Sequence, residues 1–157
     1  MTAPQLVLGS TSPRRLQLLQ AAGWQVVVQP PHVDDGQLDP RGADPSHWTM
    51  ALAWLKARSV AGVFETEPSM PIVTADTVCV IDGRVIGQPA DVEDARAMLI
   101  AMRNRAHRVL TGLCVLWHGH RHLTVDESTV HFGALSDQAC ESYLQTDLWR
   151  AARQEPV

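Results

Sequence analysis

The feature that most constrains the fold is a β-α-β pattern in the first 28 residues. Residues 5–8 form a short apolar run typical of a buried strand, and residues 24–28 form a second one. Between them, apolar residues at helical spacing predict a helix that ends near Gly23. Such units usually hold two parallel strands joined by a right-handed crossover. The opening therefore predicts an α/β fold.

The rest of the chain continues to alternate helices and strands. Prolines and aspartates predict a loop over residues 30–46. Helices are expected over residues 47–63 with Ser46 as the cap, over 91–102, and from the cap Ser136 through Leu144. Strands are expected over residues 72–75, 78–81, 85–86, 109–117 and 123–132, with a hairpin turn at Asp82-Gly83. Because no linker divides the chain, residues 1–157 are expected to form a single α/β domain with a mixed sheet flanked by helices.

Composition narrows the class of function. The chain has 157 residues, enough for one domain with a sizeable core. Its 13 basic and 17 acidic residues give a net charge of −4, which argues against a nucleic-acid partner. The 3 cysteines form no C-x-x-C pair, and the sequence has no stretch typical of a signal peptide or a membrane span. These observations predict a cytoplasmic protein with no membrane partner.

The loop at residues 9–15 has the chemistry of an anion site. Ser12 is expected to cap the following helix with its hydroxyl, with Pro13 at the first helical position. Arg14 and Arg15 then place two positive charges beside the positive end of the helix dipole, where acidic residues are normally favoured. A polyphosphate would remove this conflict, because backbone N–H groups, hydroxyls and guanidinium groups all bind phosphate. The alternative is that both arginines face solvent or pair with the acidic loop.

Two charged residues interrupt apolar patterns. Asp76 stands between the apolar runs 72–75 and 78–81, where a carboxylate is costly unless it is paired, hydrogen-bonded or metal-bound. Its alternative role is that of a turn residue. Lys56 lies on the expected inward stripe of a helix, which is formed by Leu52, Leu55, Ser59 and Val63. Its ammonium group either meets an anion in a cleft or extends to solvent.

Several motifs, in the same order along the chain, resemble those of the Maf family. The opening Leu8-Gly9-Ser10-Thr11-Ser12-Pro13-Arg14-Arg15 is similar to the family's L-A-S-x-S-P-R-R element. Later matches are Val33-Asp34-Asp35, Leu55-Lys56-Ala57, Ala75-Asp76-Thr77-Val78 and His107-Arg108-Val109-Leu110-Thr111-Gly112. Members of this family are α/β proteins that hydrolyse nucleoside triphosphates to the monophosphate and pyrophosphate with a divalent metal.

The resemblance implies roles for particular residues. Asp76 would be the catalytic residue that activates water, and together with Asp35 it would bind a divalent metal, Mg²⁺ or Mn²⁺. The phosphate groups would be bound by Ser10, Arg14, Arg15 and Lys56. Family members that act on dTTP and UTP have an arginine and a threonine at the positions that Arg14 and Thr77 occupy here. The resemblance therefore implies a metal-dependent pyrophosphatase with a pyrimidine nucleoside triphosphate as its substrate.

Two departures from the family pattern leave other functions open. Gln88 stands where the family usually has lysine, so one charge that would face phosphate is missing. The family also continues through a C-terminal segment with a K-A-G-x-Y element, which is expected to be absent here and to leave base recognition weaker. The competing hypotheses are a catalytically impaired nucleotide-binding or cell-division regulatory protein, and a truncated gene product of low stability. Association into a homodimer also stays open.

Overall fold

The computed structural model describes residues 3–33, 38–40, 42–64, 69–146 and 148–150. The helices are α1 (Pro13–Ala21), α2 (Pro45–Ala61), α3 (Val92–Met102) and α4 (Asp137–Leu144). The strands are β1 (Gln5–Gly9), β2 (Gln25–Val28), β3 (Ile72–Ile81), β4 (Arg84–Ile86), β5 (Ala106–Trp117) and β6 (His120–His131). Within the described residues, every helix is too short or too polar to span a lipid bilayer.

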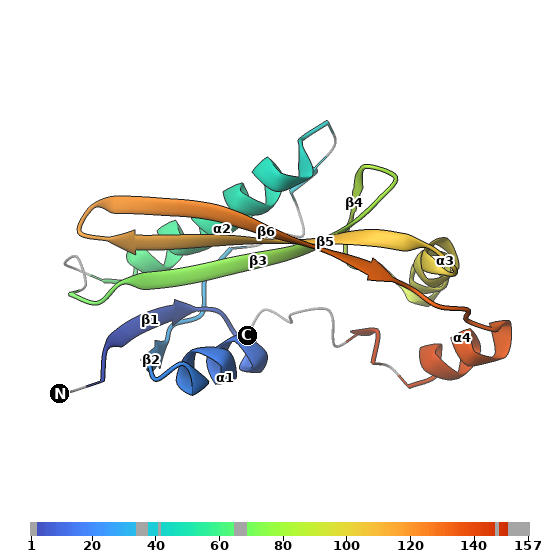
Figure 1. Cartoon of the computed structure of the whole chain (residues 1–157), viewed down its shortest axis with the longest axis horizontal. Helices are drawn as coiled ribbons and strands as arrows, with labels where there is room; N and C mark the ends of the chain where they lie inside the picture. The colour runs from blue at the N-terminus through green and yellow to red at the C-terminus, as the bar shows by residue number, and fades with distance from the viewer. Residues whose placement is uncertain (1–2, 34–37, 41, 65–68, 147, 151–157) are drawn as a thin grey trace.

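The strands of the described residues form one mixed sheet. Their order is β2-β1-β3-β5-β6, and β4 pairs with β3 off this path. The β1–β2 and β1–β3 pairs are parallel, whereas the β3–β4, β3–β5 and β5–β6 pairs are antiparallel. Helix α2 covers one face of the sheet, and α1 and α4 lie on the other side (Figure 1). The expected α/β fold with a mixed sheet and a parallel β-α-β opening is confirmed.

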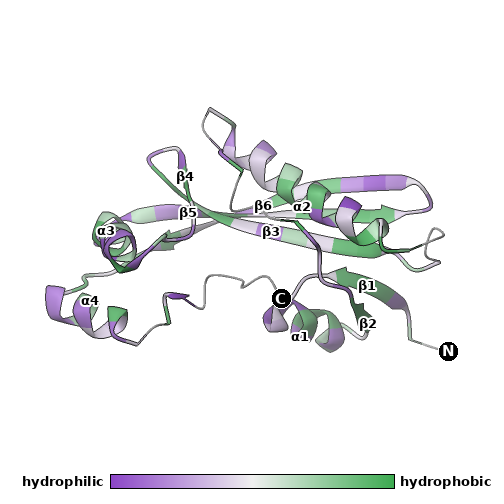
Figure 2. Cartoon of the chain, turned by 180° about the vertical axis from the view of Figure 1, so that it is seen from behind, coloured by the Kyte–Doolittle hydropathy of each residue, from purple (hydrophilic) through white to green (hydrophobic). Residues whose placement is uncertain are grey.

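The core lies between α2 and the central strands. Residues 6–8 of β1 are at most 2% exposed, and Val7 packs against Val60 of α2 and Ile72 of β3. Because β1 is buried, its side chains are apolar at consecutive positions rather than alternately. Figure 2 shows the hydrophobic residues of β1 and β2 in green. A second cluster joins α3 to α4 and contains Ala95, Cys140, Leu144 and Trp149.

Helix α2 begins earlier than predicted and has a different cap. Its first residue is Pro45, and the carboxylate of Asp44 accepts hydrogen bonds from the backbone N–H groups of Ser46 and His47, both at 3.0 Å. A residue that precedes proline favours the extended conformation, which is also the conformation of an N-cap. The prediction of Ser46 as the cap is therefore wrong.

The buried face of α2 consists largely of small and polar residues. Its members are Thr49, Leu52, Ala53, Lys56, Ala57 and Val60. Leu55 and Val63, predicted to face inward, are 41% and 47% exposed, so that part of the stripe is wrong. Leu55 lies off the buried stripe of α2, and Val63 lies beyond the end of the helix. On the buried face α2 approaches the sheet closely, since a Cβ atom at Gly112 of β5 would lie 2.5 Å from the backbone oxygen of Thr49. Such an approach favours alanine over leucine on the contacting face.

Strand β3 runs unbroken through Asp76, where the apolar pattern predicts two separate strands. The backbone of Asp76 pairs in register with Gly112 of β5. Two residues before it, the hydroxyl of Thr74 donates a hydrogen bond to the carbonyl of Ala53 at 2.7 Å and ties β3 to α2. Asp76 is therefore not a turn residue, and the sheet holds its carboxylate because a counter-charge from Lys56 lies beside it.

The hairpins follow the turn chemistry of the sequence. Asp82 and Gly83 have φ angles of 50° and 76°, and His118 and Gly119 have angles of 49° and 72°. Positive φ at both central positions is the pattern of two-residue hairpins whose twist matches that of the strands. The predicted Asp82-Gly83 turn is confirmed, and the β5–β6 hairpin turns at His118-Gly119. Strands β5 and β6 each begin three residues earlier than predicted. The Ser136 cap of α4 is also confirmed, since its hydroxyl accepts from Ala139 N–H.

Candidate active site

The loop between β1 and α1 is organised around the hydroxyl of Ser10, which is 5% exposed. Its Oγ accepts hydrogen bonds from the Ser12 backbone N–H at 3.1 Å and from Nη1 of Arg15 at 3.3 Å. The Ser12 side chain makes no capping hydrogen bond, so that prediction is wrong, although Pro13 opens the helix as expected. The first turn of α1 has no acidic residue and no side-chain cap, which leaves the positive end of its dipole to an anion.

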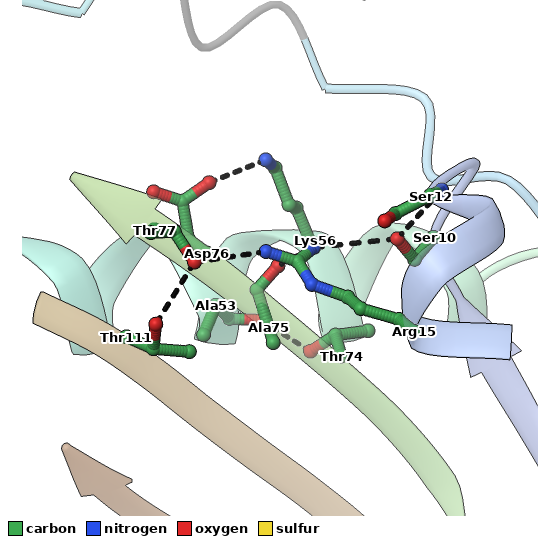
Figure 3. Close-up of polar contacts among 10 residues, drawn as sticks. All are labelled: Ser10, Ser12, Arg15, Ala53, Lys56, Thr74, Ala75, Asp76, Thr77 and Thr111. Carbon is green, nitrogen blue, oxygen red and sulfur yellow. Dashed lines mark hydrogen bonds and ion pairs between the residues drawn. The ribbon is translucent and has the colours of Figure 1, made fainter. Parts of the chain in front are cut away.

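Arg15 reaches from α1 across to β3. Its Nη1 donates to the backbone carbonyl of Ala75 at 2.8 Å, and its Nη2 donates to Oγ1 of Thr77 at 3.1 Å (Figure 3). Burial lowers the pKa of Arg15 below its ordinary value, and the negative charge of Asp76 opposes this change. The guanidinium group stays protonated at neutral pH because its ordinary pKa is so high. Arg15 therefore supplies a positive charge, held on three acceptors, close to Asp76.

Lys56 and Asp76 form a buried ion pair between α2 and β3. The Nζ of Lys56 lies 2.6 Å from Oδ1 of Asp76, and the two side chains are 7% and 10% exposed. The ammonium group thus does not extend to solvent. No hydrogen bond to the second carboxylate oxygen of Asp76 is found among the described residues.

A cleft of about 510 Å³ opens beside Asp76. Asp76 and Thr77 line it from β3, and Gln88 lines it from the segment after β4. Most of the remaining wall is apolar and includes Trp48, Leu52, Val78, Val85, Met98 and Met102. A mainly apolar cleft of this size with a few polar groups at one side is typical of a small-molecule site.

A family model described as Maf-like protein matches residues 5–152, nearly the whole chain. The chain belongs to the Maf-like family. It is 35% identical over 141 residues to the dTTP/UTP pyrophosphatase of Acholeplasma laidlawii, an alignment that covers 90% of this chain and 72% of the relative.

Two further relatives carry similar names. The chain is 36% identical over 144 residues to the nucleoside triphosphate pyrophosphatase of Corynebacterium aurimucosum, covering 90% of this chain and 71% of that protein. It is 33% identical over 147 residues to the dTTP/UTP pyrophosphatase of Pyrococcus furiosus, covering 93% of this chain and 74% of that protein.

In this Maf-like chain, two short networks bring predicted site residues together (Figure 3). One network joins Ser10, Arg15 and Thr77 by hydrogen bonds, and the other joins Lys56 to Asp76. They meet on β3, where Asp76 and Thr77 are consecutive residues.

Two predicted residues stand apart from these networks. Arg14 is exposed on α1, and it makes no hydrogen bond within the described part of the chain. Asp35, the expected second metal ligand, and its neighbour Asp34 lie outside the described residues.

The sequence did not predict two groups that contact the site residues of this Maf-like chain. One is the backbone carbonyl of Ala75, which accepts from Arg15. The other is Thr111 of β5, whose Oγ1 lies 2.9 Å from Oγ1 of Thr77. The H-x-V-x-T-G stretch contains Thr111, but the facing of its side chain depends on the register between β3 and β5, which the sequence does not specify.

Proposed function

We propose that this Maf-like chain hydrolyses a nucleoside triphosphate to the monophosphate and pyrophosphate. One observation carries the proposal: two cationic side chains, Arg15 and Lys56, flank the carboxylate of Asp76 beside a cleft. Two cations offset the charge of a polyphosphate, and a carboxylate among them is suited to accept a proton from water. The names of the relatives support the same class of reaction.

The preferred substrate within this class is dTTP or UTP. Relatives from Acholeplasma laidlawii and Pyrococcus furiosus are named for these two nucleotides. Arg14 and Thr77 also resemble the residues of family members that act on them. Thr77 lines the cleft, so its side chain can contact a bound nucleotide.

The side chains of this site suggest how the phosphate chain is positioned. The uncapped first turn of α1, the Ser10 hydroxyl and Arg15 would bind phosphate oxygens on one side. An approaching triphosphate would attract the ammonium group of Lys56, which would weaken its ion pair with Asp76 and free Oδ1.

Asp76 would then act as the general base. Its carboxylate accepts a proton from a water molecule whose oxygen forms a bond to the α-phosphorus. The bond between the α-phosphorus and the bridging oxygen breaks, and its electron pair leaves with pyrophosphate. Arg15 and Lys56 offset the negative charge of the phosphate oxygens in the bound substrate and in the transition state.

The donor set also fits a divalent cation. One carboxylate oxygen of Asp76 lies outside its contact with Lys56, and Mg²⁺ usually takes one or two carboxylates together with substrate phosphates. Asp76 would hold the ion with Asp35, which lies outside the described residues. When bound, the ion would neutralise negative charge on the phosphate groups.

The proposal is tested by measuring pyrophosphate release from dTTP, UTP, CTP and 7-methyl-GTP with Mg²⁺, with Mn²⁺ and with a chelator. We expect release from dTTP and UTP, and a loss of at least about 100-fold in Asp76→Asn, because the amide does not accept the proton. The matched control is Asp137→Asn on α4, whose side chain is 89% exposed and pairs with Arg103.

Calorimetric titration of the same nucleotides measures binding separately from release, and three outcomes can then be distinguished. Binding without release by the wild type would support a nucleotide-binding protein and contradict the enzyme. Release that is unchanged in Asp76→Asn would contradict the role of Asp76 alone. Release that is unchanged by the chelator would contradict the metal requirement alone.

A further inference from the structure

Thr111 of β5 joins the Arg15 network through Thr77, but it does not itself line the cleft. It lies directly opposite Thr77 in the register of β3 and β5. The two hydroxyl oxygens are 2.9 Å apart, and Thr77 Oγ1 also accepts from Nη2 of Arg15 at 3.1 Å. The order of contacts is therefore Thr111, Thr77, Arg15.

The three acceptors of Arg15 differ in how firmly they are held. The carbonyl of Ala75 is part of the β3 backbone, and the hydroxyl of Ser10 is buried and bound by the Ser12 N–H. The hydroxyl of Thr77 instead belongs to an exposed side chain. The χ1 angle of this side chain has more than one staggered minimum. Its hydrogen bond with Thr111 selects the minimum in which Oγ1 meets Arg15.

We infer that Thr111 is a positioning residue of this site. It fixes the hydroxyl of Thr77, and through that hydroxyl it fixes the orientation of the Arg15 guanidinium group. Nη1 is occupied by Ser10 and Ala75, and Nη2 donates one hydrogen to Thr77. Nε–H and the second Nη2 hydrogen then point in a set direction, where they bind phosphate oxygens as a pair. This inference rests on the proposed function, in which Arg15 binds the phosphate chain.

The test uses two replacements of one side chain. Thr111→Val keeps the shape but has no hydroxyl, whereas Thr111→Ser keeps the hydroxyl. The matched control is Thr124→Val on β6, an exposed threonine opposite Leu113 and thus on the same face of the sheet. Each variant is measured for kcat and KM with dTTP, for its melting temperature, and for the rate at which phenylglyoxal modifies Arg15, followed by peptide mass spectrometry.

We expect Thr111→Val to raise the KM for dTTP about tenfold with little change in kcat, because an Arg15 that is no longer oriented binds ground state and transition state less well. Phenylglyoxal should modify Arg15 about threefold faster, because the guanidinium group leaves its acceptors more often. Thr111→Ser and Thr124→Val should match the wild type in both measurements. Thr77→Val combined with Thr111→Val should be no worse than Thr77→Val alone, because both act through one hydroxyl.

Two results would overturn the inference. One is a lower kcat at unchanged KM together with a lower melting temperature, as a loss of folded protein would give. The other is an unchanged rate of Arg15 modification in Thr111→Val. If the wild type releases no pyrophosphate, the proposed function fails, but the modification rate still decides whether Thr111 positions Arg15.

Discussion

The Nζ atom of Lys56 lies 2.6 Å from Oδ1 of Asp76, and both side chains are buried between α2 and β3. This contact joins α2 to β3, the strand that carries the candidate general base. A buried pair of this kind contributes little net stability relative to apolar residues, because both charges lose their hydration. Its position beside the cleft is explained more readily by chemistry than by folding.

The two roles of this pair are separated by stability measurements. Lys56→Met leaves the Asp76 carboxylate buried without its counter-charge and should lower the free energy of unfolding by about 3 kcal/mol. Lys56→Met combined with Asp76→Leu removes both charges and should restore most of that loss, yet it should release no pyrophosphate. Urea unfolding of the wild type, both single variants and the double variant gives the coupling. A double variant as unstable as Lys56→Met would show that the ion pair supports the fold.

The two neighbouring arginines should respond differently to truncation. Arg15→Ala removes the donors to Ser10, Ala75 and Thr77 and should lower the free energy of unfolding by about 1–3 kcal/mol as well as raise the KM for dTTP. Arg14→Ala, on the exposed side of α1, should raise KM and leave the unfolding curve within about 0.5 kcal/mol of the wild type. Equal losses of stability in the two variants would contradict this assignment.

Gln88 offers a gain-of-function test at the cleft wall. Gln88→Lys adds a positive charge on the cleft that Asp76 lines, and it should lower the KM for dTTP about three- to tenfold through attraction to the triphosphate. The matched control is Gln145→Lys, the same change at the exposed C-cap of α4. Steady-state kinetics at two salt concentrations measures both. Equal effects of the two substitutions would mean that net charge matters and that the position of Gln88 does not.

The packing of α2 on the sheet depends on Gly112. A Cβ atom there would lie 2.5 Å and 2.6 Å from the backbone oxygen and carbon of Thr49, so Gly112→Ala should displace the helix that carries Lys56. We expect a loss of about 1–3 kcal/mol in the free energy of unfolding and a lower kcat/KM. Gly133→Ala, where no atom lies within 4 Å of the new Cβ, is the control and should unfold like the wild type. Denaturant unfolding with circular dichroism checks both, and a stable Gly112→Ala would show that α2 shifts freely.

Local sequence patterns predicted much of the fold and pointed to the loop at residues 9–15 as a candidate anion site. The apolar run before Gly9, Pro13 at the start of α1, and the Asp82-Gly83 turn each follow from short-range rules of backbone conformation. The positive charges of Arg14 and Arg15 beside a helix N-terminus likewise indicate an anion site without reference to any tertiary contact. Those inferences need only residues within one or two turns of each other.

Tertiary structure decided which of these groups meet. The sequence placed Lys56 on a helix and Asp76 in an apolar stretch, but only the packing of α2 on β3 puts their charges 2.6 Å apart. The register of β3 and β5 decided that Thr111 faces Thr77, and the reach of one guanidinium group decided that Arg15, rather than Arg14, joins the network. The physical reason is that side-chain contacts between distant segments depend on how closely and in which register the elements pack, and a small residue such as Gly112 sets that distance.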